Sequence, residues 1–237
     1  MKALILNSGT GSRMGNIGTC KCLCLLEVSE GVSIVDEQLR RLLKCGITDI
    51  CMTTGPYEEE LKSYLQNRYP SVNFKFVHNN IYSQTNYIYS IFLAKEWVQE
   101  DILLIHGDLV FGTELLRDAI ASPHSCMVTD STKTLPEKDF KAVVKNSLIR
   151  SIGVEFFESA LCAQPLYKLQ WQDWSIWLEE ICRFCQAGRT KVYAEDAFNN
   201  VSGKMKLLPL DAKGRMCFEI DNAGDLSYAR EVYKQCK

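Results

Sequence analysis

Apolar positions in the first half of the chain form short runs that alternate with stretches of helical spacing. The short runs predict strands at residues 3–6, 47–54, 73–78 and 101–105. Between them, apolar side chains recur every three or four residues, which predicts helices at residues 33–45, 57–69 and 86–98. Strands that alternate with helices predict a mostly parallel sheet covered on both faces.

The second half of the chain has a different pattern, with short strands and short connections. Strands are predicted at residues 126–130, 142–145, 148–154, 191–195 and 205–210, and helices at residues 171–187 and 222–234. The expected fold class is α/β: a single Rossmann-like domain over residues 1–237, with a mostly parallel mixed sheet flanked by helices and a small substrate-binding insertion. Residues 1–110 are expected to form a nucleotide-binding half and residues 111–237 an acceptor-binding half.

Composition narrows the classes of partner. The formal net charge is −2, which argues against a nucleic-acid partner because such proteins favour a basic face. No apolar stretch approaches the roughly 20 residues that span a bilayer, so no membrane partner is expected. Eleven cysteines without a secretion signal indicate reduced thiols in a cytoplasmic protein. The oligomeric state stays open, a homo-oligomer included.

A glycine-rich loop follows the first predicted strand. It runs Asn7-Ser8-Gly9-Thr10-Gly11-Ser12-Arg13-Met14-Gly15, and Lys21 comes shortly after. Glycines let backbone N–H groups approach a polyphosphate, while an arginine and a lysine offset its charge. The loop lacks the third glycine of a dinucleotide fingerprint and the Gly-Lys-Ser/Thr of a P-loop. The alternative is a tight turn with no ligand.

These residues carry a resemblance. Gly9-x-Gly11-x-Arg13-Met14 followed by Lys21 resembles the signature of the sugar-phosphate nucleotidyltransferase superfamily, except that Cys20 stands where a proline is usual. Three further segments resemble the small cytidylyltransferases that activate phosphocholine or 2-aminoethylphosphonate: Thr85-Asn86-Tyr87-Ile88-Tyr89-Ser90, Leu135-Pro136-Glu137-Lys138-Asp139-Phe140-Lys141 and Tyr193-Ala194-Glu195-Asp196-Ala197-Phe198-Asn199.

The resemblance implies a metal site and a nucleotide site. Asp108 and Asp221 are the implied Mg2+ ligands, and with Arg13 and Lys21 they are the implied catalytic groups. The implied nucleotide-binding residues are Asn7, Ser8, Gly9, Thr10, Gly11, Ser12, Arg13, Lys21, Gln84, Thr85, Asn86 and Ser90. The alternative for Asp108 is a turn cap, and for Asp221 the cap of the last helix. Glu219 is a candidate supporting group, and His106 is interpreted as structural.

The acceptor side is implied by the remaining segments. Its candidate residues are Lys138, Lys141, Tyr193, Glu195 and Asp196. Acidic groups beside aromatic rings suit a cationic amine. The expected partners are therefore CTP and a small anionic substrate that bears an amine, and the expected reaction transfers CMP to 2-aminoethylphosphonate. Alternatives are phosphocholine, a sugar 1-phosphate as acceptor, or an inactive nucleotide-binding module with a regulatory role.

Overall fold

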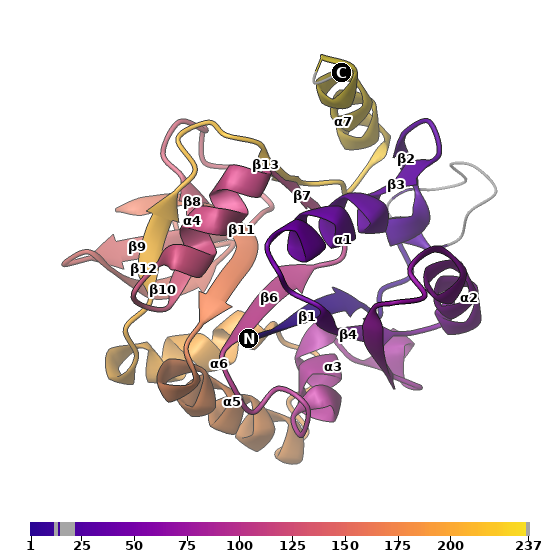
Figure 1. Ribbon diagram of the computed structural model, residues 1–237. Coiled ribbons are helices and arrows are strands. Elements are labelled where there is room, and N and C mark those ends of the chain that lie inside the picture. The colour runs from indigo at the N-terminus through magenta and orange to yellow at the C-terminus, as the bar shows by residue number, and fades with distance from the viewer. Residues whose placement is uncertain (12–13, 15–21, 236–237) are drawn as a thin grey trace.

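The structure is a computed structural model, and it describes residues 1–11, 14 and 22–235. Helices and strands alternate through the first half, and strands dominate the middle of the second half (Figure 1). The strands are β1 (Lys2–Asn7), β2 (Glu27–Ser29), β3 (Val32–Ser33), β4 (Asp49–Thr54), β5 (Asn73–His78), β6 (Ile102–His106), β7 (Leu109–Phe111), β8 (Cys126–Asp130), β9 (Lys141–Lys145), β10 (Leu148–Gly153), β11 (Ala160–Leu169), β12 (Leu208–Asp211) and β13 (Cys217–Glu219). The α-helices are α1 (Ile34–Lys44), α2 (Glu58–Arg68), α3 (Tyr87–Ala94), α4 (Thr113–Ala121), α5 (Trp171–Gln186), α6 (Ala194–Val201) and α7 (Ala223–Gln235), and the 3-10 helices are η2 (Leu23–Leu25), η3 (Tyr82–Gln84) and η4 (Ser202–Lys204).

One sheet of nine strands connects the two halves of the chain. Its order is β10-β9-β11-β6-β1-β4-β5, and β8 joins β11 and carries β12. Within it β1, β4, β5 and β6 are parallel to one another, and β11 runs antiparallel to β6. The predicted α/β fold, a mixed central sheet flanked by helices, is confirmed.

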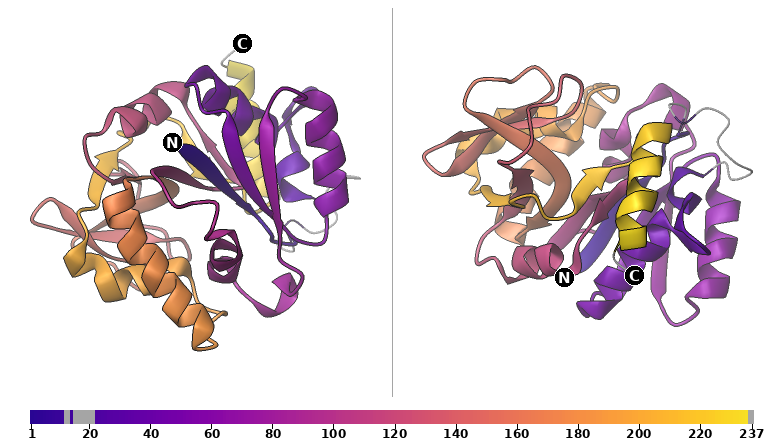
Figure 2. Two further views of the ribbon diagram at one scale, coloured as in Figure 1. Left: turned by 60° about the horizontal axis from the view of Figure 1, so that its bottom comes forward. Right: turned by 90° about the horizontal axis from the view of Figure 1, so that it is seen from above.

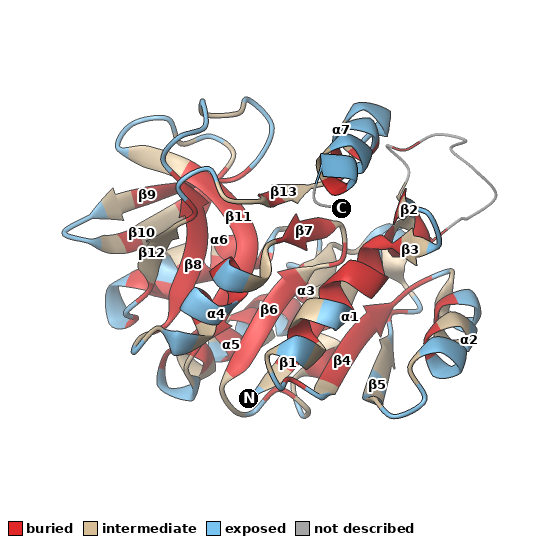
Figure 3. Cartoon of the chain, turned by 45° about the horizontal axis from the view of Figure 1, so that its top comes forward, coloured by how far each residue is buried: buried red, intermediate tan, exposed pale blue. Residues whose placement is uncertain are grey.

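The parallel strands are covered on both faces. Leu4 belongs to a core cluster with side chains of α3, α5 and α6, whereas its neighbours Ala3 and Ile5 belong to a second cluster with side chains of α1 and α4. Figure 3 shows β4 and β6 in red between helices whose outer surfaces are exposed, whereas the edge strand β5 is tan because it is only partly buried. The inner strands have no polar side, which is why β1, β4 and β6 are largely continuous apolar runs in the sequence.

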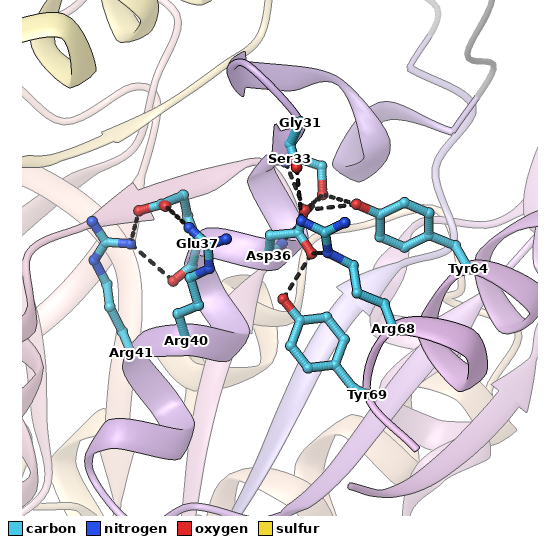
Figure 4. Close-up of polar contacts among 9 residues, drawn as sticks. All are labelled: Gly31, Ser33, Asp36, Glu37, Arg40, Arg41, Tyr64, Arg68 and Tyr69. Carbon is cyan, nitrogen blue, oxygen red and sulfur yellow. Dashed lines mark hydrogen bonds and ion pairs between the residues drawn. The ribbon is translucent and has the colours of Figure 1, made fainter. Parts of the chain in front are cut away.

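A buried carboxylate holds the start of α1 against α2. The Ser33 N–H donates to Asp36 (2.8 Å), and the Asp36 N–H donates back to Ser33 Oγ (3.2 Å). The Asp36 carboxylate also accepts from the Tyr64 hydroxyl (2.6 Å), the Tyr69 hydroxyl (2.7 Å) and Arg68 Nε (2.8 Å) (Figure 4). Burial alone would raise the pKa of Asp36, but these hydrogen bonds hold it below its ordinary value.

Strand β11 and helix α4 were not predicted. Strand β11 contains Pro165, which argues against a strand in a sequence because proline cannot donate to the ladder. In the structure its pairing with β8 shifts register between Ala163 and Tyr167, on either side of Pro165. The strand therefore tolerates the proline at an irregularity in the ladder.

The strand predicted at residues 191–195 is wrong. Residues 191–193 have no regular structure, and α6 begins at Ala194. The helix start is stabilised because the Tyr193 N–H donates to the Asp196 carboxylate (2.8 Å). Trp177 Nε1 donates to the Ala194 carbonyl (2.8 Å), which joins this helix start to α5.

The last helix returns to the first half of the chain. Figure 2 shows α7 beside the N-terminal elements. Its buried residues Leu226 and Ala229 belong to a cluster with Val28 and Ile34. This packing fixes the connection between β13 and α7, which contains Asp221.

No helix in the described part of the chain is long and apolar enough to cross a membrane.

Candidate active site

A cavity of about 380 Å³ lies at the carboxyl ends of the parallel strands, the edge where open α/β sheets bind ligands. The predicted site residues that line it are Ser8, Gly9, Thr10, Gly11, Thr85, Asn86, Ser90, Asp108, Lys138, Tyr193 and Asp221. Five predicted residues are described but do not line it: Asn7, Gln84, Lys141, Glu195 and Asp196. Ser12, Arg13 and Lys21 lie outside the described residues.

Acidic side chains from two distant segments meet at one end of this cavity. Asp108 follows β6, and Glu219 is the last residue of β13. Strand β13 pairs antiparallel with β7, where Glu219 is opposite Leu109, and the Ile220 N–H donates to the Asp108 carbonyl (2.9 Å). His106, Asp108 and Glu219 each place a potential ligand atom within 4.8 Å of the others.

This cluster fits a divalent cation. Asp108 Oδ1 is buried and has no hydrogen-bond partner within the described part of the chain. A buried carboxylate oxygen without a donor costs free energy, which a bound cation would offset. Carboxylate oxygens are the protein ligands that Mg2+ prefers. Asp108 and Glu219 supply them, and Asp221 lines the same cavity.

The charges of the cluster shift its pKa values strongly. Burial and the neighbouring charges of Glu219 and Asp221 raise the pKa of Asp108 to about 7, against the opposing charge of His106. Burial lowers the pKa of His106, but its hydrogen bond to Glu219 (3.1 Å) and the surrounding carboxylates raise it to about 9. Negative charge is therefore concentrated here and partly balanced by His106.

The start of α7 is capped by Asn222 and Asp225, the neighbours of Asp221. The N–H groups of Gly224 (2.8 Å) and Asp225 (3.2 Å) both donate to Asn222 Oδ1. The Asp225 carboxylate in turn accepts from the N–H groups of Asp221 and Asn222, both at 3.0 Å. Asn222 and Asp225 thus cap α7, and Asp221 lines the cavity.

The glycine-rich loop forms another wall. Gly11 has φ +63°, and a Cβ there would lie 3.2 Å from Leu23 Cβ. At Gly55, a Cβ would lie 2.4 Å from the Ser8 carbonyl oxygen, so the turn after β4 approaches this loop closely only because residue 55 has no side chain. Asn7 is the last residue of β1, directly before the loop, and a Cβ at Gly107 would overlap its Oδ1.

A polar network lies beside the loop, at the start of α3. Asn79 Nδ2 donates to Thr85 Oγ1 (3.0 Å) and to Ser90 Oγ (3.1 Å). Asn86 Oδ1 accepts from the Tyr87 N–H (2.7 Å) at the first turn of α3. Sequence reasoning missed Asn79, although its position after β5 resembles that of Asp108 after β6.

The second half contributes an aromatic wall and one lysine. The Phe140 ring lies 4.9 Å from the Tyr193 ring, and Tyr193 lies 5.8 Å from Tyr87, with distances measured between centroids. The Tyr87 ring in turn packs edge-on against His106 (4.9 Å). Lys138 is the only lysine or arginine among the described residues that line the cavity.

Three predicted acceptor residues have other contacts. Lys141 is fully buried, and its ammonium donates to the carbonyls of Pro136 (2.6 Å) and Glu137 (3.4 Å). Asp196 accepts from the Tyr193 N–H at the start of α6.

Glu195 is 1% exposed and accepts from two tyrosine hydroxyls, those of Tyr87 and Tyr167. Tyr87 therefore separates the Glu195 carboxylate from the cavity.

Comparison with known proteins places the chain among nucleotide transferases. A family model described as the MobA-like NTP transferase domain matches residues 3–139. Choline-phosphate cytidylyltransferase of Streptococcus pneumoniae is 24% identical over 251 residues, which cover 99% of both chains. CMP-5'-(3-aminopropyl)phosphonate synthase of Streptomyces rubellomurinus is 28% identical over 136 residues. That match covers 57% of this chain and only 22% of the relative's length.

A further relative, CTP:phosphoglutamine cytidylyltransferase of Campylobacter jejuni, is 28% identical over 139 residues. The match covers 56% of this chain and 53% of the relative, so the chain spans about half of its length.

Solved structures share the fold. The inositol-1-phosphate CTP transferase from T. maritima aligns with a TM-score of 0.80 and 20% identity, covering 99% of this chain and 95% of that one. CTP:phosphocholine cytidylyltransferase from Streptococcus pneumoniae aligns with a TM-score of 0.79 and 19% identity, covering 98% of each chain.

Proposed function

Because the chain belongs to the family of MobA-like NTP transferase domains, we propose that it is a cytidylyltransferase that transfers CMP from CTP to a small amine-bearing phosphate ester or phosphonate. The observation that carries this proposal is the arrangement of the cavity. The glycine-rich loop and the acidic cluster of Asp108, Glu219 and Asp221 share it with Lys138. One cavity thus offers groups for a triphosphate, a divalent cation and a second anion.

The chemistry needs positioning and charge more than proton transfer. A phosphate or phosphonate oxygen of the acceptor attacks the α-phosphorus of CTP, the new P–O bond forms, and pyrophosphate leaves. The attacking oxygen is already ionised near neutral pH, so no general base is required. The obstacles are repulsion between two anions and their alignment, which fixed cationic and N–H groups reduce.

The residues of the cavity have distinct roles in this scheme. The N–H groups of Gly9, Thr10 and Gly11 bind the triphosphate, and the ammonium of Lys138 binds the acceptor anion. Asp108, Glu219 and Asp221 would hold Mg2+, which when bound neutralises phosphate charge and polarises the reacting phosphoryl group. Arg13 and Lys21 are assigned to stabilising the developing charge only because the family resemblance implies that role.

The amine end of the acceptor has two candidates. The sequence predicts 2-aminoethylphosphonate, because Glu195 and Asp196 would accept hydrogen bonds from a primary ammonium. Neither carboxylate lines the cavity, whereas the rings of Tyr87, Phe140 and Tyr193 do. A quaternary ammonium has no N–H to donate and favours aromatic faces, so this geometry supports phosphocholine better than 2-aminoethylphosphonate.

A pyrophosphate-release screen tests the proposal. CTP, UTP, GTP and dTTP are each paired with phosphocholine, 2-aminoethylphosphonate and sugar 1-phosphates, with Mg2+ present. We expect turnover with CTP and an amine-bearing acceptor, with a higher kcat/KM for phosphocholine. Turnover only with sugar 1-phosphates would show that the acceptor is a sugar phosphate and not an amine-bearing substrate. No turnover with any pair would favour an inactive nucleotide-binding module.

A further inference from the structure

A ten-residue loop presents the acceptor groups to the cavity. It comprises residues 131–140, between β8 and β9, and contains neither helix nor strand. Lys138, Asp139 and Phe140 of this loop line the cavity. Their positions therefore depend on whatever holds the loop against the sheet.

Lys141 holds the part of the loop next to Lys138. Its Nζ donates to the Pro136 carbonyl (2.6 Å) and to the Glu137 carbonyl (3.4 Å), immediately before Lys138 in the chain. The same nitrogen lies 4.1 Å from the centroid of the Phe157 ring. The ammonium thus has loop carbonyls and an aromatic ring as its surroundings.

The backbone of Lys141 is fixed in the sheet. Lys141 is the first residue of β9, and it pairs with Gly153 of β10 and Cys162 of β11. It is 0% exposed. A buried ammonium costs free energy unless hydrogen bonds replace its water, so its contacts with the loop are needed to keep it there. The rigid sheet is thereby coupled to a loop that has no ladder of its own.

Other contacts hold the remaining parts of the loop. The Ala163 N–H donates to the Phe140 carbonyl (3.0 Å), and Lys133 Nζ donates to the Cys217 carbonyl (2.8 Å). The Cys162 thiol, on the strand paired with Lys141, donates to the Thr134 carbonyl (3.2 Å). None of these three contacts involves the Pro136 and Glu137 carbonyls directly before Lys138, which accept from Lys141.

We propose that Lys141 is a positioning residue, which sets the place of Lys138 by holding the carbonyls of Pro136 and Glu137. It does not bind the acceptor itself. The part of this proposal that concerns acceptor binding rests on the proposed function, whereas the attachment of the loop does not.

Hydrogen exchange of the whole chain tests the attachment without turnover. In Lys141→Met, peptides covering residues 131–140 are expected to exchange faster, and peptides covering residues 101–108 to stay as in the wild type. The matched control is Lys145→Met, on the same strand but exposed. Unchanged exchange over residues 131–140 in Lys141→Met overturns the proposal. If that variant does not fold, Lys141→Arg keeps the charge but changes the geometry of the donor, so the same peptides are expected to exchange faster than in the wild type and in Lys145→Met; unchanged exchange there overturns the proposal as well.

Steady-state kinetics test the consequence for binding. Lys141→Met is expected to raise the acceptor KM about tenfold, the effect of losing a charge-assisted contact, with the CTP KM near its wild-type value. The double variant Lys138→Met/Lys141→Met separates positioning from direct contact. If Lys141 acts through Lys138, the double variant has the acceptor KM of Lys138→Met alone; if the two effects multiply, Lys141 acts independently and the proposal is wrong. Faster exchange in a protein that transfers no nucleotide would leave the loop attachment standing and overturn the proposed function instead.

Discussion

The two walls of the cavity differ in how the chain builds them. The wall from the first half consists of turns at the carboxyl ends of parallel strands, where Ser8, Asn79 and Asp108 follow β1, β5 and β6. The wall from the second half consists of a long loop and the start of α6, with Lys138 and Tyr193. Side-chain hydrogen bonds hold this second wall, among them those of Lys141 at the start of β9.

The difference in construction suggests that the first wall aligns the phosphates and the second wall selects the acceptor. A strand end has little freedom, because the ladder and two layers of helices fix it, so the first wall suits steps that demand exact alignment of phosphates. A loop held by a few side chains can change by substitution without disturbing the sheet. We therefore expect substitutions in the first wall to change kcat and those in the second wall to change the acceptor KM.

Asp108→Asn is expected to have the largest effect, because Asp108 of the first wall forms the proposed cation site together with Glu219. Loss of the charge that holds Mg2+ should lower kcat by on the order of 10³-fold. The unfolding temperature without metal should not fall. The raised pKa of Asp108, about 7, means that its ionised form is disfavoured in the fold, and asparagine removes that cost. Near-wild-type turnover at saturating Mg2+ would remove Asp108 from the mechanism.

Lys21→Ala tests whether the loop after β1 acts on the transition state. The resemblance predicts that kcat falls by about 10²-fold, since the charge matters most as charge builds on the transferring group. Initial rates at varied CTP and varied acceptor measure this split. If only the acceptor KM rises, Lys21 belongs to the second wall and the comparison between the walls fails.

Lys138→Met tests the second wall directly. Removal of a cation that contacts a phosphate or phosphonate should raise the acceptor KM by roughly 10- to 50-fold, with little change in the CTP KM. Lys145→Met is the control on a neighbouring exposed lysine. A rise in the CTP KM of similar size would assign Lys138 to the nucleotide instead.

Of the two acidic residues of α6, only Glu195 is expected to affect the kinetics, and its effect is smaller than that of Lys138. Glu195→Gln removes a buried charge behind Tyr87, which should lower kcat/KM for phosphocholine about threefold to fivefold. Asp196→Asn affects only the cap of α6, so its kinetics should match the wild type. A larger kinetic effect from Asp196→Asn would restore it as an acceptor-binding residue.

Asp36→Asn should leave both substrates' kinetics unchanged, because the Asp36 cluster joins α1 to α2 and does not line the cavity. It should lower the free energy of unfolding near neutral pH by about 2 kcal/mol. Because folding lowers the pKa of Asp36, its contribution is present above the unfolded-state pKa of about 3.9 and is lost as pH falls through the folded-state value.

Urea unfolding of wild type and Asp36→Asn at several pH values measures that contribution. The difference between the two proteins should therefore be full above about pH 5 and shrink below pH 4. A difference that grows as the pH falls would contradict this sign.

Local pattern was enough to predict the parallel strands of the first half and the helices between them, but not the short strands β2, β3 and β7. The apolar runs of β1, β4 and β6 identify strands buried on both faces, and the order of strands and helices implies a parallel sheet. From this it follows that Asp108 and the glycine-rich loop meet at one edge, because parallel strands end on the same side. The sequence by itself thus determined which edge of the sheet carries the first wall.

Only the tertiary structure decided the rest of the site. Glu219 joins Asp108 because β13 pairs with β7 across more than one hundred residues, a contact that leaves no local pattern. Lys141 and Glu195 carry the residue types of an acceptor site, yet their side chains contact loop carbonyls and tyrosine hydroxyls. The sequence does not show whether a charged side chain faces a cavity or is buried beside it. The packing of strands and loops around the residue decides between these two positions, because burying the charge is tolerated only where hydrogen-bond partners replace water.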